Sequence, residues 1–124
     1  MIATILLSIG LAACSAPSSI APASADSLIH GEVKNKNFRL VDVRTPEEFA
    51  QGHLAGAALV DFKSPTFADE IAKLPREAKI LIYCRSGHRS GIALQQMQSM
   101  GFKDVRDIGG GINAWMSAGL PLGN

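Results

Sequence analysis

Apolar residues along the chain follow two spacings, one typical of strands and the other of helices. Four short, nearly continuous apolar runs bounded by turn residues indicate strands, at residues 38–43, 57–62, 79–83 and 105–108. Segments with apolar residues three or four positions apart, next to Pro, Gly or a capping residue, indicate helices at residues 26–33, 46–52, 67–74, 90–100 and around Trp115. Because strands and helices alternate, we expect right-handed crossovers and a parallel sheet with helices on both faces.

The run at residues 79–83 has the clearest consequence for function. It is apolar at almost every position, as in strands that are buried on both faces of a parallel sheet. Ligands of such sheets bind beyond the carboxyl ends of the strands. Cys84 follows this run directly, so we expect it at the edge of the sheet where a ligand binds.

Composition and charge narrow the class of protein. The chain has 124 residues, of which 47% are hydrophobic and 19% charged, and its formal net charge is +1. That length is enough for one domain to bury a core without disulfide bonds. A balanced charge lacks the clustered basic excess of nucleic-acid-binding proteins, so we expect no nucleic-acid partner. The two cysteines have different surroundings and are not expected to pair, which leaves Cys84 as the thiol of the folded body.

The N-terminal residues have the pattern of an export signal. Residues 2–13 form an uncharged apolar run, too short to cross a bilayer as a helix but of the length found in signal peptides. The run ends in Leu-Ala-Ala-Cys-Ser, which resembles the lipobox of bacterial lipoproteins. The resemblance implies a signal peptide over residues 1–13, a lipid anchor on Cys14 and a periplasmic location, at the outer membrane because Ser15 is not Asp. No Lys or Arg precedes the run, and the alternative is an apolar helix buried in the domain.

Residues 14–25 resemble a linker in composition. They are rich in Pro and Ser and poor in large apolar side chains, which predicts a flexible tether behind the lipidated Cys14. Fully extended, residues 15–25 would span about 35 Å. The folded domain is then expected over residues 26–124.

The loop that starts at Cys84 has a composition that favours an ionised thiol. A thiol pKa falls at a helix N-terminus and beside cations, and Gly87 permits the positive φ that turns backbone N–H groups inward. Arg85 and Arg89 add positive charge and paired donors for an oxyanion, unless both only form surface ion pairs. We therefore expect Cys84 to be a nucleophile rather than a small core residue. The expected cradle for a small, anionic, sulfur-bearing substrate consists of Arg85, Ser86, Gly87, His88, Arg89 and Ser90.

Four separate motifs in chain order resemble the single-domain rhodaneses, the thiosulfate sulfurtransferases. They are Leu40-Val41-Asp42-Val43-Arg44 with Glu47-Glu48-Phe49, then Gly52-His53-Leu54-Ala55-Gly56-Ala57, the Cys-x-x-Gly-x-Arg loop from Cys84, and Gly109-Gly110-Gly111 with Trp115 and Gly119-Leu120-Pro121. The resemblance covers residues 26–122. It implies an α/β fold with a five-stranded parallel sheet flanked by helices on both faces.

The resemblance also implies a double-displacement reaction. The Cys84 thiolate attacks the outer sulfur of thiosulfate, sulfite leaves, and a Cys84 persulfide forms. A thiophilic acceptor such as cyanide, a small thiol or a protein thiol then takes the sulfur, and the inward N–H groups stabilise the anion in both halves of the cycle. No cofactor is expected, and no metal either, since the three histidines show no metal-ligand spacing.

Two other functions use the same kind of loop. Cysteine-based phosphatases and arsenate reductases have five residues between Cys and Arg, whereas four separate Cys84 from Arg89 here. Ser90 then stands where their arginine would be, and the smaller cradle suits a sulfane sulfur better than a phosphate. The other alternative is a module that carries or senses a persulfide for a partner protein, which uses the same thiolate and is compatible with sulfur transfer.

Structural roles are expected for several polar residues and glycines. Asp42 and Arg44 are expected to form a buried or half-buried ion pair. His88 is either a base or a residue that fills the loop. The triplet at residues 109–111 matches neither dinucleotide nor Walker signatures, and it is expected to turn the chain into the last helix close to the neighbouring loop.

Overall fold

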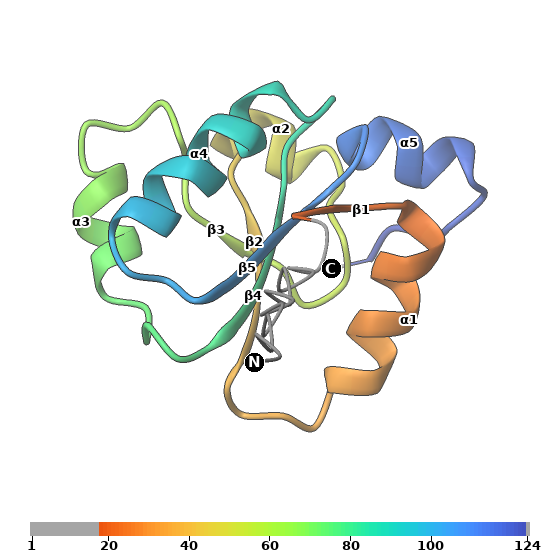
Figure 1. Ribbon diagram of the computed structural model, residues 1–124. Helices are drawn as coiled ribbons and strands as arrows, with labels where there is room; N and C mark the ends of the chain where they lie inside the picture. The colour runs from red at the N-terminus through yellow and green to blue at the C-terminus, as the bar shows by residue number, and fades with distance from the viewer. Residues whose placement is uncertain (1–17, 124) are drawn as a thin grey trace, which may run out of the picture.

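The computed structural model describes residues 18–123, so the predicted signal peptide and the predicted anchor Cys14 lie outside the described residues. One parallel sheet with helices on both faces organises this range (Figure 1). The strands are β1 (Ser19–Ile20), β2 (Phe38–Asp42), β3 (Ala58–Leu59), β4 (Lys79–Tyr83) and β5 (Asp104–Ile108). The helices are α1 (Pro22–Glu32), α2 (Pro46–Ala50), α3 (Phe67–Ala72), α4 (His88–Ser99) and α5 (Gly111–Ser117). The strand order is β1-β5-β4-β2-β3 and all pairings are parallel, which confirms the predicted fold class.

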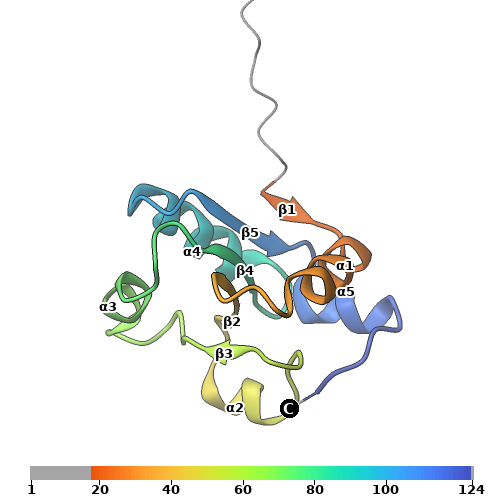
Figure 2. The same ribbon diagram turned by 90° about the horizontal axis from the view of Figure 1, so that it is seen from below.

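The central strand β4 is apolar at every position after Lys79, because both of its faces are covered. Ile80 and Ile82 belong to the buried cluster under α3 and α4, whereas Leu81 and Tyr83 belong to the cluster under α1 and α5. This division follows from the alternation of side chains along a strand. Figure 2 shows the two pairs of helices on opposite sides of the sheet. The chain therefore leaves β4 at Tyr83 with a rigid strand behind it.

Helix α2 begins at Pro46, as its sequence predicts, and the structure shows a reciprocal cap at its start. The Thr45 hydroxyl accepts the Glu48 N–H at 3.3 Å, and the Glu48 carboxylate accepts the Thr45 N–H at 3.3 Å. Pro46 occupies the first helical position, where its missing N–H costs no hydrogen bond. The cap fixes the direction of the Glu48 side chain, which has a second partner described below.

The predicted ion pair of Asp42 and Arg44 is confirmed. Both residues are buried, and the Arg44 Nη2 atom lies 2.7 Å from Asp42 Oδ2. The same nitrogen donates to the carbonyl of Gly52 at 2.7 Å, so neither charge is left unpaired in the interior. This pair joins the end of β2 to the turn that follows α2.

The N-terminal boundary of the domain differs from the predicted one. Ser19 and Ile20 form the edge strand β1 beside β5, and α1 begins at Pro22, four residues before the predicted cap Asp26. Ala25, a residue of this helix, is fully buried. The prediction of a flexible tether is therefore wrong for residues 19–25. A segment rich in Pro, Ser and Ala suits an edge strand and a Pro-initiated helix as well as a linker, and only its pairing with β5 distinguishes them.

Candidate active site

Cys84 lies directly after β4, at the carboxyl edge of the sheet, as the sequence predicts. It is 1% exposed and it is the free cysteine of the described residues. Gly87 caps α4 with φ of +103°, which confirms the predicted left-handed conformation. This turn directs the Gly87 N–H at the Cys84 sulfur, 3.0 Å away.

Hydrogen bonds around the sulfur favour its ionised form. Burial raises the pKa of Cys84, but the Ser90 hydroxyl and the N–H groups of Ser90, Gly87 and Ser86 together lower that pKa below its ordinary value. The N–H donors come from the last loop residues and the start of α4, so the start of the helix holds them in place. The arrangement stabilises a negative charge on sulfur at this point of the molecule.

The first turn of α5 supports the loop from the other side. The Ile112 N–H donates to the carbonyl of Cys84 at 2.9 Å, and the Asn113 N–H donates to that of Arg85 at 3.1 Å. These are helix-start donors that have no partner inside their own helix. Gly111, with φ of +63°, allows this approach, because a Cβ there would lie 2.5 Å from both carbonyl oxygens. The predicted structural role of the glycine triplet is therefore confirmed.

Arg89 is engaged by a carboxylate rather than left free to bind an anion. Its guanidinium binds both oxygens of Glu48 in α2, at 2.7 and 2.9 Å, and the two side chains are 17% and 24% exposed. The Arg89 hydrogen bond is the main cause that lowers the pKa of Glu48 to about 2; burial opposes it and Thr45 adds to it. The charge of Arg89 still acts on Cys84 through space. Its first role is to join α2 to the start of α4.

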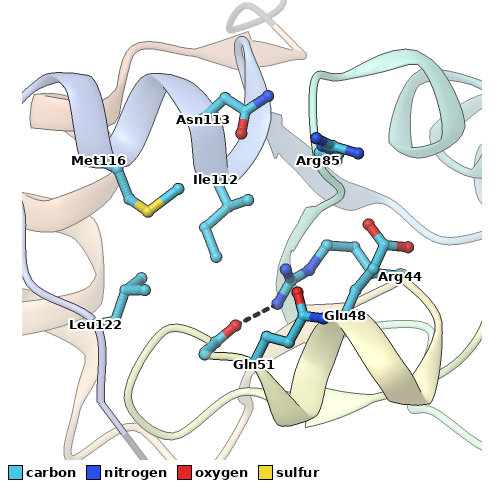
Figure 3. Close-up of a pocket in the computed structure, with 9 residues that line it drawn as sticks. Arg44, Glu48, Gln51, Arg85, Ile112, Asn113, Met116 and Leu122 are labelled. Carbon is cyan, nitrogen blue, oxygen red and sulfur yellow. Dashed lines mark hydrogen bonds between the residues drawn. The ribbon is translucent and has the colours of Figure 1, made fainter.

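A pocket of about 260 Å³ opens beside the Cys84 loop (Figure 3). Its lining residues are Arg44, Glu48, Gln51, Gly52, Arg85, Ile112, Asn113, Met116 and Leu122. Figure 3 shows Ile112, Met116 and Leu122 on one side, with Arg44, Glu48 and Arg85 on the other. Arg85 is exposed, and within residues 18–123 its guanidinium has no ion pair. The pocket therefore offers a free cation at its rim beside an apolar wall, where Met116 is 48% and Leu122 39% exposed.

The remaining loop residues divide into exposed and buried ones. Ser86 and His88 have exposed side chains, whereas Ser90 is fully buried. The Ser90 hydroxyl lies 3.4 Å from the Cys84 sulfur and 2.9 Å from the carboxylate of Asp107 in β5. Sequence reasoning missed Asp107. The sequence does contain an indication of it. Asp107 lies two positions after the apolar Val105, so both side chains point to the same, buried face of the strand.

Among residues 18–123, no group of three or more His, Cys, Asp or Glu side chains is placed to hold a metal ion. In that range no helix has both the length and the apolar character needed to cross a bilayer.

Known proteins are similar to this chain in sequence and in architecture. Residues 24–118 match the family model described as rhodanese-like domain. The chain is 35% identical over 116 residues to thiosulfate sulfurtransferase 16, chloroplastic, of Arabidopsis thaliana, with 86% of this chain and 97% of that protein covered. It is 34% identical over 98 residues to a sulfurtransferase of Allochromatium vinosum, with 79% and 90% covered.

A solved structure agrees with the fold. The crystal structure of a rhodanese-related protein from Thermoplasma volcanium superposes with a TM-score of 0.70 at 26% identity. The superposition covers 85% of this chain and 96% of that one. Together with the family match over residues 24–118, this means that the chain belongs to the rhodanese-like domain family.

Proposed function

We propose that this chain is a sulfurtransferase that moves a sulfane sulfur from a small anionic donor such as thiosulfate to a thiophilic acceptor, through a persulfide on Cys84. The observation that carries the proposal is the Cys84 sulfur, which is buried among hydrogen-bond donors at the carboxyl edge of the sheet. The names of the related sulfurtransferases support the class of reaction.

The first half-reaction loads sulfur onto Cys84. The thiolate attacks the outer sulfur of thiosulfate, a bond forms between the two sulfurs, and sulfite leaves with the electron pair of the broken S–S bond. Arg85, exposed at the rim of the pocket, provides the cation for the sulfonate group of the donor. The N–H groups of Ser86 and Gly87 then face an anionic persulfide in place of the thiolate.

The second half-reaction returns Cys84 to its starting state. Cyanide or a thiolate attacks the outer sulfur of the persulfide, and Cys84 leaves as a thiolate. A lowered thiol pKa favours this step, because a thiol of low pKa is the better leaving group. The apolar wall formed by Met116 and Leu122 suits the body of an organic acceptor.

The size of the site favours sulfur transfer over phosphate chemistry. Cys84 is only 1% exposed, and a short loop covers it. A single divalent sulfur needs less room at the nucleophile than a tetrahedral phosphate. We therefore expect no hydrolysis of an aryl phosphate by the domain.

Intact mass spectrometry with thiosulfate tests the proposal. We expect the wild-type chain to gain the mass of one sulfur, to lose it on addition of cyanide, and to release thiocyanate. Cys84→Ser should show neither event, whereas Ser99→Ala, a change on an exposed part of α4, should behave as wild type. Thiocyanate production at the wild-type rate by Cys84→Ser would refute the mechanism. Loading without turnover by cyanide or small thiols would support the persulfide carrier that delivers sulfur to a protein thiol.

We also propose that Cys14 is lipidated and anchors the domain on the periplasmic side of a membrane. Because Ser15, and not Asp, follows Cys14, we propose the outer membrane. The support is the uncharged apolar run that ends in Leu-Ala-Ala-Cys-Ser. Since β1 begins at Ser19, the domain would lie within about 17 Å of the anchored residue. Cells fed a labelled fatty acid should label the wild type and Cys84→Ser but not Cys14→Ser. Equal label on Cys14→Ser, or none on any chain, would refute the anchor.

A further inference from the structure

Three polar groups form a continuous chain behind the reactive sulfur. They come from three elements: Cys84 after β4, Ser90 in α4 and Asp107 in β5. The Cys84 sulfur lies 3.4 Å from the Ser90 hydroxyl oxygen, which lies 2.9 Å from Oδ2 of Asp107. Asp107 is 4% exposed and Ser90 is fully buried. A carboxyl group in this position has no part in the sulfur-transfer steps described above.

The distances indicate how the protons are arranged in the resting site. The Ser90 hydroxyl has one proton and two acceptors, Asp107 at 2.9 Å and the carbonyl of Gly87 at 3.4 Å. The carboxylate is nearer, and a bond to an anion is stronger, so the proton lies toward Asp107. A lone pair of Ser90 then faces the sulfur and accepts the Cys84 S–H. This chain runs in one direction, from thiol to hydroxyl to carboxylate.

We propose that Ser90 and Asp107 form a proton relay that ionises Cys84. In the step, the Cys84 S–H bond breaks and its proton bonds to the Ser90 oxygen, while the former Ser90 proton bonds to Oδ2 of Asp107. The negative charge passes from Asp107 to the sulfur, nothing is oxidised, and no proton leaves the site. Afterwards Ser90 donates to the thiolate and Asp107 donates to Ser90. Asp107 is therefore a positioning residue, which acts on the sulfur through the hydroxyl.

One further charge, that of Arg89, acts on this site from outside the chain of three groups. On the α4 side, Arg89 acts on Cys84 and is itself bound to Glu48 of α2. On the sheet, β4 pairs Ile82 with Asp107, and β1 pairs Ser19 with it. Two anions joined through one hydroxyl repel each other in a buried site, so we expect Cys84 and Asp107 to share one negative charge.

The relay has a consequence for the proposed sulfur transfer. This inference rests only in part on that proposed function. Thiolate forms without a base from solvent, although the sulfur is shielded by the loop. When the acceptor removes the persulfide sulfur, the same proton can return from Asp107 to Cys84. The ionisation of Cys84 itself is measured without any sulfur donor, so failure of the relay and failure of sulfur transfer are distinguishable.

The test is the rate of Cys84 alkylation by iodoacetamide, followed by intact mass from about pH 4 to about pH 10. A pair that shares one charge loses its protons in two macroscopic steps, so the wild type should show a plateau between two rises in rate. Asp107→Asn keeps the shape but takes up no proton, and it should show a single rise. At about pH 6 we expect its alkylation rate to be about tenfold below wild type.

Two further variants and a control complete the experiment. Ser90→Ala should also show a single rise of the alkylation rate with pH. Ser90→Thr keeps a hydroxyl and should show both rises, as the wild type does. Asp104→Asn, on the same strand and paired with Arg106 at its surface, should keep the wild-type profile. If Asp107 were only a fixed negative charge, Asp107→Asn would raise the alkylation rate at low pH, and that result would overturn the relay. Two preserved steps in Ser90→Ala would overturn it as well, whether or not Asp107→Asn folds.

Discussion

Gly111 is the position where a single methyl group should disturb both the stability of the domain and its reactive loop. A Cβ at Gly111 would lie 2.5 Å from the carbonyl oxygens of Cys84 and Arg85, which are backbone atoms and have little freedom to move. The residue also has φ of +63°, a left-handed conformation that costs an L-residue about 1–2 kcal/mol. Gly111→Ala therefore combines an unfavourable backbone angle with a steric overlap.

The overlap adds the loss of the bonds that join α5 to the loop. To relieve it, the helix has to move away, and the Ile112 and Asn113 N–H bonds to the loop carbonyls, at 2.9 and 3.1 Å, are lengthened. Each is worth about 1 kcal/mol. We expect Gly111→Ala to lower the free energy of unfolding by about 3–4 kcal/mol, a large part of the 5–15 kcal/mol typical of a domain.

Gly119→Ala is the matched control for this change. Gly119 has φ of +76° but no atom within 4 Å of a Cβ, so it carries the cost of the backbone angle without the overlap. The entropy that an alanine removes from the unfolded chain is common to both variants and cancels in the comparison. Urea denaturation, followed by the fluorescence of Trp115, a buried residue of α5, measures the free energy of unfolding of both variants. Equal stability of the two variants would refute the steric argument, as would unchanged alkylation of Cys84 in Gly111→Ala.

Two further predictions concern charged residues around the loop. Arg85→Ala should raise KM for thiosulfate about tenfold or more while Cys84 alkylation by neutral iodoacetamide stays unchanged, because its free guanidinium binds the anionic donor. An unaltered KM would assign donor binding to another group. Glu48 has its pKa lowered from 4.5 to about 2 in the folded state, so its stabilising effect is present above pH 4.5 and is lost as the pH falls toward 2. Partial exposure reduces that effect to about 1–2 kcal/mol, and Glu48→Gln should remove it in acid titrations of stability, whereas the exposed Glu47→Gln should not. Identical acid profiles of the two variants would contradict the prediction.

The local features of the site are those that short sequence patterns encode. The apolar run of β4 requires burial on both faces, and this places the next residue, Cys84, at the ligand-binding edge of the sheet. Thr45 and Pro46 start α2 by a cap that involves only near neighbours. Gly87 has the positive φ that its loop requires. Each of these features depends on residues within a few positions of one another, so the order of residues alone was enough to predict them.

The tertiary structure decided which distant residues meet. Glu48 and Arg89 are 41 positions apart in the chain. Arg89 was predicted to bind the substrate, and in the structure its guanidinium forms an ion pair that joins α2 to α4. Asp107 reaches Ser90 only because β5 lies beside β4 under α4. The residues around Ser19 have the composition of a linker, but they form a strand because they pair with the edge of β5. Side-chain partners of this kind depend on the order of the strands and the placement of the helices. The packing of the whole core determines both, so a local sequence pattern does not predict them.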